Sequence, residues 1–356
     1  MSVSGSSSAT VQGFSSLDAG ESPLLCVGTY AASGGRGLLP LIRDPEWRVG
    51  GPVAAAENSS FGAFDAGRDL AFFVDERNEG RVRIFRRAEP VWMEVAAQPT
   101  LGEAPCYLAL SPARTRLAVA NYGSGSLAVF TLDPATGLPT GEPRLWQGTG
   151  QGPDAERQEG PHVHCAVFDG EDRLYAVDLG TDRIFCFGSE GEEPSVAFQT
   201  RPGAGPRHLV FHPGLPVAYL VSELASTITV LDRDGPRFAV RSVHRIQPED
   251  FHGDNLGGHL SLDAAGTRLY VSNRGHDSIA VLAIEEDGDL RLLQHAPTHG
   301  ASPRSFVLLE AERLFVVANE EAQNVAVIAL TDDGRLGEVQ AVIPVPGAAF
   351  PFVVAR

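Results

Sequence analysis

The stretch LYVSNRGHDSIAVL (residues 269–282) consists of an apolar strand, a short polar turn and a second apolar strand. β-Branched residues on both sides of Asn, Gly and Asp are typical of a β-hairpin. The same pattern occurs at six other places in the chain. These copies are LLCVGTYAASGGRGLLPL (24–41), LAFFVDERNEGRVRIF (70–85), LAVANYGSGSLAVF (117–130), LYAVDLGTDRIFCF (174–187), AYLVSELASTITVL (218–231) and LFVVANEEAQNVAVI (314–328).

A polar residue ends the first strand of every copy. These residues are Thr29, Asp75, Asn121, Asp178, Ser222, Asn273 and Asn319. Their spacing of 44 to 57 residues is typical of a four-stranded propeller blade, and no stretch shows a sustained helical period. The seven copies therefore predict an all-β fold, a seven-bladed β-propeller.

A second apolar element precedes most copies, and we expect it to form the innermost strand of each blade. It is present as EAPCYLALSP (103–112), GPHVHCAVFD (160–169), GPRHLVFHP (205–213), GGHLSLD (257–263) and SPRSFVLLE (302–310). Proline at the first position of a strand costs no ladder hydrogen bond. The C-terminal AAFPFVVAR (348–356) has no hairpin partner of its own. We expect it to pair with the N-terminal copy, so that the N- and C-terminal strands share a blade and hide two sheet edges.

The repeats predict a single propeller domain over residues 24–356. Residues 1–23 are rich in Ser and Gly and lack the basic start and apolar core of a signal peptide, so we expect a disordered N-terminal lead. No apolar run reaches the roughly 18 residues that a membrane span needs.

Composition excludes several classes of function. A net charge of −17 disfavours nucleic acid and anionic membranes as partners. The chain contains no Lys, which excludes a Schiff-base lysine and a phosphate-loop lysine and leaves Arg as the fixed cation. The four cysteines have no zinc-site spacing. We expect a cytoplasmic protein, a monomer or weak homodimer, that uses no cofactor.

Charged and polar residues gather at the strand ends that a propeller brings to one mouth. The predicted inner strands begin with His162, His164, Arg207, His208 and Arg304, and the hairpin strands end with Asp178, Glu223, Asn273, Arg274 and Glu320. Each residue alone has a structural interpretation, but their convergence favours a functional cluster. Because this set is cationic, it would repel a divalent metal. For Tyr30, Asp75, Glu76 and Tyr122 at the rim, and for His212 in a turn, the structural interpretation is favoured.

Three segments carry a resemblance to a known family. GPHVHCAVFDGEDRLYAVDLGTDRIFCF, GAGPRHLVFHPGLPVAYLVSELASTITVL and LYVSNRGHDSIAVL resemble the lactonase family of seven-bladed propellers. That family includes propeller-type 6-phosphogluconolactonase and carboxy-cis,cis-muconate cyclase, and the resemblance covers roughly residues 24–356. It implies that His164, Arg207, Glu223 and Arg274 are catalytic. His162, His208, Asn273, Arg304 and Glu320 would then contact the substrate.

The leading hypothesis is hydrolysis of 6-phosphogluconolactone, a small anionic lactone, to 6-phosphogluconate. Arg207 and Arg274 would hold the phosphate or stabilise the oxyanion, and either Glu223 or His164 would take a proton from water. Formation of a muconate lactone is the second hypothesis, since Arg pairs also bind polycarboxylates. A non-catalytic propeller scaffold is the third.

Overall fold

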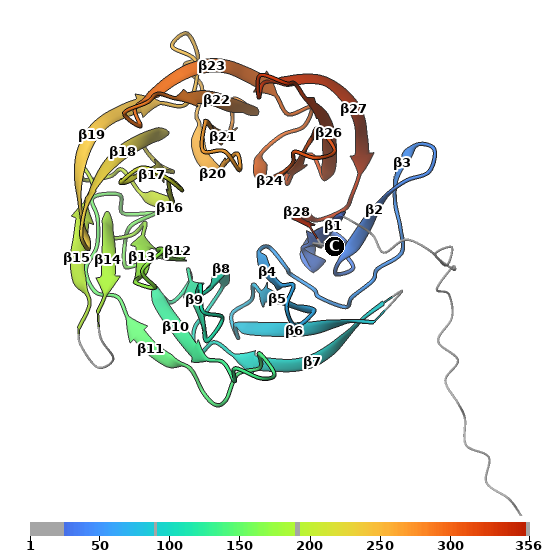
Figure 1. Cartoon of the computed structure of the whole chain (residues 1–356), viewed down its shortest axis with the longest axis horizontal. Coiled ribbons are helices and arrows are strands. Elements are labelled where there is room, and N and C mark those ends of the chain that lie inside the picture. Colours follow the sequence, from blue (N-terminus) through green and yellow to red (C-terminus); the bar gives the residue numbers. More distant parts are fainter. Residues whose placement is uncertain (1–24, 89–90, 189–192, 354–356) are drawn as a thin grey trace, which may run out of the picture.

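The computed structural model describes residues 25–88, 91–188 and 193–353. Within these ranges the strands form seven antiparallel sheets of four strands each, arranged around a common axis (Figure 1). The predicted all-β, seven-bladed propeller is therefore confirmed. The lead expected over residues 1–23 lies outside the described residues.

Within each blade the four strands are arranged in order from the central axis to the outer edge of the propeller (Figure 1). The innermost strands are β28 (Ala348–Val353), β4 (Gly62–Asp65), β8 (Pro105–Leu110), β12 (Val163–Phe168), β16 (Pro206–Phe211), β20 (Leu256–Leu262) and β24 (Pro303–Leu309). The second strands are β1 (Leu25–Thr29), β5 (Leu70–Asp75), β9 (Arg116–Asn121), β13 (Leu174–Asp178), β17 (Val217–Ser222), β21 (Arg268–Arg274) and β25 (Leu314–Asn319).

The two outer layers complete the blades. The third strands are β2 (Leu39–Arg43), β6 (Arg81–Ala88), β10 (Ser126–Thr131), β14 (Arg183–Phe187), β18 (Thr227–Asp234), β22 (Ser278–Ile284) and β26 (Asn324–Leu330). The outermost are β3 (Trp47–Val49), β7 (Val91–Pro99), β11 (Arg144–Gln147), β15 (Ser195–Gln199), β19 (Arg237–Arg245), β23 (Leu290–Pro297) and β27 (Leu336–Pro344). One 3₁₀ turn, η1 (Ala31–Ser33), follows β1.

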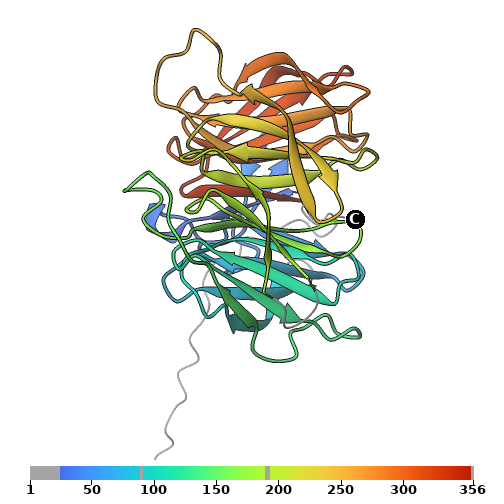
Figure 2. The same cartoon turned by 90° about the vertical axis from the view of Figure 1, so that its left-hand side faces the viewer.

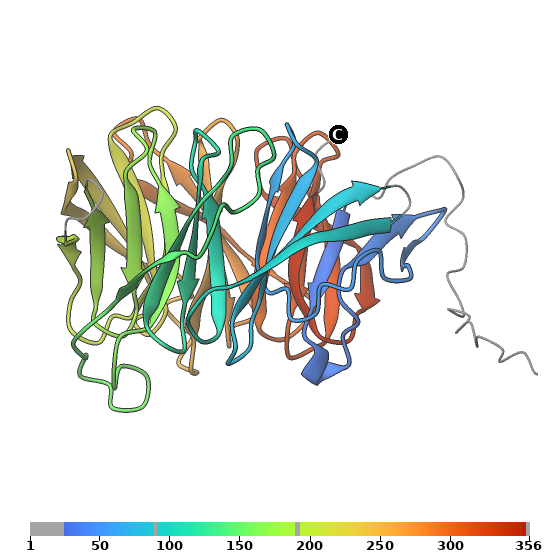
Figure 3. The same ribbon diagram turned by 90° about the horizontal axis from the view of Figure 1, so that it is seen from below.

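The strands run between the two faces of the ring, and the connecting loops gather on those faces (Figures 2 and 3). Second strands such as β5 and β25 are buried along their whole length, because a neighbouring sheet covers each of their faces. The apolar core therefore lies between successive blades. The described residues hold no helix with the length and hydrophobicity needed to cross a bilayer.

In three blades the asparagine at the end of the second strand fastens its blade to the preceding one. Asn319 Nδ2 donates to the carbonyl of Thr298 over 2.9 Å, directly after β23 of the preceding blade. Asn273 Nδ2 likewise donates to the carbonyl of Ile246 over 2.9 Å, directly after β19. Both side chains are fully buried. A buried amide needs such partners, which explains why asparagine recurs at the end of these three apolar strands.

The chain termini close the ring as predicted. β28 pairs antiparallel with β1, with Leu25 opposite Val353 and Cys26 opposite Phe352. The Phe352 ring packs against the rings of Phe73 and Trp92 in the next blade, at centroid distances of 4.8 and 6.3 Å. The last strand therefore supplies both the inner edge of one blade and part of its contact with another.

We predict that Phe352→Ala lowers the free energy of unfolding by about 3–5 kcal/mol, because it opens a cavity at the closure. Val342→Ala on the outer strand β27 is the control, since Val342 is 45% exposed and its loss should change stability by less than about 0.5 kcal/mol. Urea unfolding of both variants measures the difference. Equal effects would show that the closure does not depend on this contact.

Candidate active site

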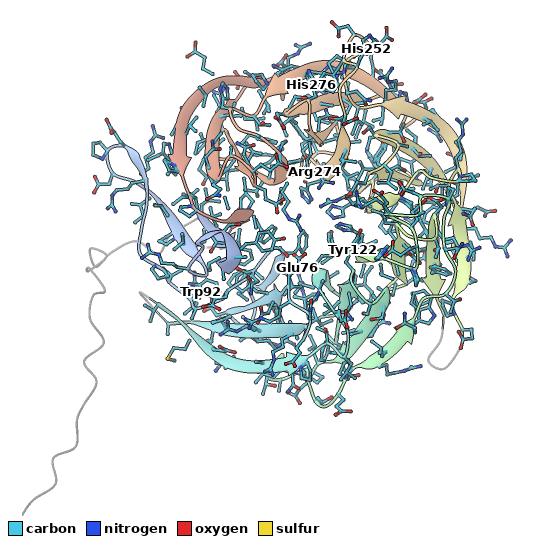
Figure 4. The ribbon with its side chains drawn as sticks, turned by 180° about the vertical axis from the view of Figure 1, so that it is seen from behind. Glu76, Trp92, Tyr122, His252, Arg274 and His276 are labelled. Carbon is cyan, nitrogen blue, oxygen red and sulfur yellow. The ribbon has the colours of Figure 1, made fainter. Side chains whose placement is uncertain are left out.

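The antiparallel order of each blade brings the start of the innermost strand and the end of the second strand to the same mouth of the ring. In β16 and β17, Pro206 lies opposite Ser222, and Glu223 follows directly. Two side chains that are 16 residues apart in sequence, Arg207 and Glu223, thereby become neighbours. Figure 4 shows Glu76, Tyr122 and Arg274 around the central opening, while Trp92 lies farther out.

An extra residue interrupts the pairing at the start of the inner strands. In β16 the register passes from Pro206 to His208, which leaves Arg207 without an opposite residue. Such a bulge redirects the side chain. We call the residues at this register shift in the inner strands the bulge ring. They are Cys106, His164, Arg207, Gly258, Arg304 and Ala349. Ser60 has the corresponding place ahead of β4, where Val74 N donates to Phe61 O.

A second set, the rim ring, consists of the residue that follows the polar end of each second strand. Its members are Tyr30, Glu76, Tyr122, Leu179, Glu223, Arg274 and Glu320. In two blades a glutamate of the rim ring lies beside the arginine of the bulge ring. These pairs are Arg207 with Glu223 at 3.0 Å and Arg304 with Glu320 at 3.3 Å.

Glu223 is the centre of the first charged cluster. Its Oε2 accepts from Arg207 Nε at 3.0 Å and lies 2.7 Å from Arg274 NH2. Its Oε1 accepts from Arg157 NH2. Arg207 and Glu223 are each only 2% exposed. Three guanidinium groups from three separate segments therefore share one buried carboxylate.

Arg304 is the centre of the second charged cluster. Its guanidinium contacts Glu320 at 3.3 Å and Glu76 at 3.5 Å, and it lies over the ring of Tyr30 at 5.3 Å from the centroid. Tyr30 in turn donates its hydroxyl to Glu76 Oε2 at 2.7 Å. Residues of three blades are joined in this way across the mouth.

Three histidines lie between the charged clusters. The ring of His208 is 5.2 Å from that of His164 and 5.4 Å from that of His259. Arg207 NH1 lies 3.1 Å from His208 Nε2. His164 Nδ1 also lies 3.7 Å from Cys106 Sγ. Among the described residues, no group of three or more His, Cys, Asp or Glu side chains is arranged to hold a metal ion.

The charges set the protonation of the site. Burial alone would raise the pKa of Glu223, but the adjacent Arg274 and Arg207 lower the pKa below its usual range. Burial and the positive charge of Arg207 lower the pKa of His164 and of His208 well below 6.5. The same two causes lower the pKa of His259 to about 3. The carboxylate is therefore ionised and the imidazoles are neutral near pH 7.

The structure brings most of the expected residues to the mouth, but Asn273 is a correction. Its amide is fully buried and fastens β21 to the preceding blade, so it does not face the axis. Arg274, one residue later, takes that place. His162 lies at the edge of the mouth, where its ring stacks on Tyr122 at 4.5 Å and its Nε2 contacts Glu159 at 3.2 Å.

Sequence reasoning missed Arg157 and undervalued the rim residues Tyr30, Glu76 and Tyr122. Arg157 lies in the loop between β11 and β12, outside every repeat. Gln158 anchors that loop by donating to Leu179 O and Asp182 Oδ1 at 2.8 and 2.9 Å. The rim residues did carry a signal, since each directly follows the polar residue that ends a second strand.

Almost the whole chain is similar to known proteins. Residues 24–353 match the family described as "Lactonase, 7-bladed beta-propeller". A Bacillus subtilis protein named 6-phosphogluconolactonase is 30% identical over 347 residues, covering 90% of this chain and 95% of the relative.

Solved structures agree with the family match. A periplasmic gluconolactonase from Pseudomonas aeruginosa superposes with a TM-score of 0.84 at 28% identity, covering 93% of this chain and 98% of that one. A Lactobacillus plantarum protein gives a TM-score of 0.85 at 29% identity, covering 93% and 99%.

We predict that the protein loses stability in mild acid, because burial lowers the pKa values of His164, His208 and His259. Because the folded pKa values lie below those of the unfolded chain, the unfolded state binds more protons once the pH falls below about 6.5. Stability should therefore be complete above that pH and decline toward pH 4.5. The slope of unfolding free energy against pH gives the number of protons taken up on unfolding. In His259→Gln that number should be lower by roughly one between pH 6 and 4.5. Urea titrations across this range measure it, and an unchanged slope would contradict the assignment.

Proposed function

The chain belongs to the lactonase family of seven-bladed β-propellers, and from this premise we propose that it hydrolyses an anionic sugar lactone. The substrate that we propose is 6-phosphogluconolactone, after the name of the Bacillus subtilis relative. Lactone hydrolysis in general is supported by the family. The choice of substrate depends on the charges at the mouth.

The observation that carries the proposal is the excess of arginine in the two charged clusters. Four arginines face three glutamates there: Arg157, Arg207, Arg274 and Arg304 against Glu76, Glu223 and Glu320. The neighbouring histidines are neutral. Within these two clusters the formal charge is therefore +1, in a protein whose net charge is −17, which favours a negatively charged ligand at this place.

The proposed reaction adds water to the lactone carbonyl. The carbonyl oxygen becomes an oxyanion, which Arg207 and Arg274 stabilise because their guanidinium groups are already fixed by Glu223. The ring C–O bond then breaks, and the leaving oxygen takes a proton. The product is the open hydroxy acid. A lactone is reactive enough that no covalent intermediate is required.

Of the two candidates for the base, the geometry favours His164. Both oxygens of Glu223 already accept hydrogen bonds from guanidinium groups, and these bonds weaken a carboxylate as a base. His164 is neutral near pH 7 because burial and Arg207 lower its pKa. It would take a proton from the attacking water. As an acidic imidazolium, it would then readily return that proton to the leaving oxygen.

We predict that Arg274→Gln lowers kcat/KM for 6-phosphogluconolactone by roughly 100- to 1000-fold, the usual effect of removing one donor to an oxyanion. Arg291→Gln is the matched control, because Arg291 is 63% exposed and pairs with Glu285 away from the mouth. Acid release from the lactone, corrected for spontaneous hydrolysis, measures both variants. Circular dichroism confirms that each is folded.

The same assay distinguishes the competing functions. Turnover of a carboxylated muconolactone but not of 6-phosphogluconolactone would replace the proposed substrate with a polycarboxylate. No turnover of either lactone, with no protection of the protein by either, would favour a binding scaffold. Activity in Arg274→Gln within twofold of wild type would contradict the proposed role of this arginine.

The lowered pKa of His164 predicts where the rate falls in acid. Because the base stays deprotonated well below pH 6.5, kcat/KM should pass through the range around pH 6.5 without a decline and fall only at lower pH. Initial rates over pH 4.5–8 test this, with folding checked at each pH. A decline centred near pH 6.5 would indicate a base with an ordinary histidine pKa, contrary to the assignment.

A further inference from the structure

The positive charge at the mouth is concentrated around Glu223. In the first charged cluster three guanidinium groups share its single carboxylate, and they belong to Arg157, Arg207 and Arg274. In the second charged cluster the proportions are reversed, because the guanidinium of Arg304 contacts two carboxylates. The first cluster is thus formally cationic and the second formally anionic. A negatively charged ligand group is therefore attracted to the side of the mouth at Glu223.

Arg157 is the arginine of that cluster that faces solvent. Its side chain is 35% exposed, whereas that of Arg207 is 3% and that of Arg274 is 13% exposed. Its NH2 bonds Glu223 Oε1 and lies 3.5 Å from the hydroxyl of Tyr122. Within the described part of the chain, its Nε and NH1 have no hydrogen-bond partner, although both carry N–H donors. Arg157 therefore keeps free donors for a ligand that arrives from solvent and needs no enclosed cavity.

The loop between β11 and β12 holds the backbone of Arg157 in place. The backbone N–H of Arg157 donates to Asp154 Oδ1 at 3.1 Å. The next residue, Gln158, is fully buried and bonds Leu179 O and Asp182 Oδ1 of the neighbouring hairpin. A side chain on an ordered backbone loses less conformational freedom when it binds a ligand. The loop therefore presents Arg157 as a fixed cation at the mouth, although it belongs to no repeat.

The position of Arg157 suits a charged group that is remote from the lactone ring. Glu223 Oε1 bonds Arg157, whereas Oε2 contacts the two buried arginines proposed to stabilise the oxyanion. Tyr122 likewise connects the two places. Its ring centroid is 5.4 Å from that of His164, the proposed base, while its hydroxyl is 3.5 Å from Arg157 NH2. One small sugar can therefore have its lactone carbonyl at the buried arginines and its charged end at Arg157.

We infer that Arg157 binds the negatively charged group of the substrate, a phosphate or a carboxylate, and thereby selects a charged lactone over an uncharged one. This inference rests on the proposed lactonase function for the identity of the substrate. The free N–H donors of Arg157 bond the anion, while its NH2 keeps its contact with Glu223. Arg157 thus determines specificity, and the buried arginines act on the lactone carbonyl. Binding of the anion itself does not require turnover.

Arg157→Gln tests the inference in kinetics. This variant should raise KM for 6-phosphogluconolactone by about 10- to 100-fold, the expected loss for a hydrogen bond to a charged group. KM for uncharged glucono-1,5-lactone should change by less than about twofold. Arg157→Lys should show a smaller increase for the charged lactone, because it keeps the positive charge but loses the planar set of donors. Arg291→Gln is again the matched control and should change neither KM, since Arg291 pairs with Glu285 away from the mouth.

The uncharged lactone separates this role from a structural one. If Arg157 only held Glu223 in place, Arg157→Gln would lower kcat/KM for charged and uncharged lactones to the same extent. Such equal effects, or no effect on any lactone, would overturn the inference. A carboxylated muconolactone is assayed in parallel. An increase of KM for this compound and not for 6-phosphogluconolactone would support the role of Arg157 and identify the bound group as a carboxylate.

Calorimetric titration with inorganic phosphate measures binding of the anion without catalysis. Its affinity should fall at least about tenfold in Arg157→Gln and stay unchanged in Arg291→Gln. If no lactone is turned over but this loss occurs, the proposed function fails and the anion site stands. If lactones are turned over while KM and phosphate affinity are unchanged in Arg157→Gln, the function stands and the anion site fails. Neither turnover nor phosphate binding in the wild-type protein would overturn both.

Discussion

The extra residue at the start of the inner strands is the constraint on which the mouth depends. In a regular strand, successive side chains point to opposite faces, so only one of Arg207 and His208 would face the axis. The bulge between Pro206 and His208 removes this alternation, and both side chains line the channel. Because the irregularity recurs at the same place in β8, β12, β20, β24 and β28, it presents side chains at nearly equivalent positions around one axis.

The charges that the bulges bring together are costly to bury, and Glu223 offsets that cost. A buried guanidinium without a partner is strongly unfavourable, and burial together with Arg274 lowers the pKa of Arg207 to about 10. Glu223 bonds three arginines at once, so its charge stabilises all of them. This also explains why it is a poor base: the contacts that keep the arginines in place occupy its lone pairs. In the proposed reaction, positioning the arginines and accepting a proton would therefore be tasks for different residues.

Much of the fold and part of the site could be predicted from the sequence. The hairpin repeat fixed the number of blades, and its spacing placed Arg207 beside Glu223, because inner and second strands are antiparallel in every blade. The repeat could not show that Arg274 lies at the mouth and Asn273 does not, because this depends on which of two successive residues faces the axis. Arg157 could not be placed, because its loop has no repeat.

The bulge ring has different residues on different blades, and this departure from sevenfold symmetry gives the mouth its particular arrangement of charges. The bulge ring carries His164, Arg207 and Arg304 on some blades, but Gly258 on the blade that follows Arg207. A Cβ at Gly258 would lie 2.2 Å from Ser272 Oγ, which already accepts from His259 N. Arg207 NH1 donates to the carbonyl of Gly258 at 2.8 Å. Glycine therefore leaves room for Ser272 of the same blade, while the Gly258 carbonyl holds Arg207 of the preceding blade by a bond that adds no charge. That bond orients the NH1 end of Arg207, whose Nε is already paired with Glu223, without placing a second carboxylate beside it.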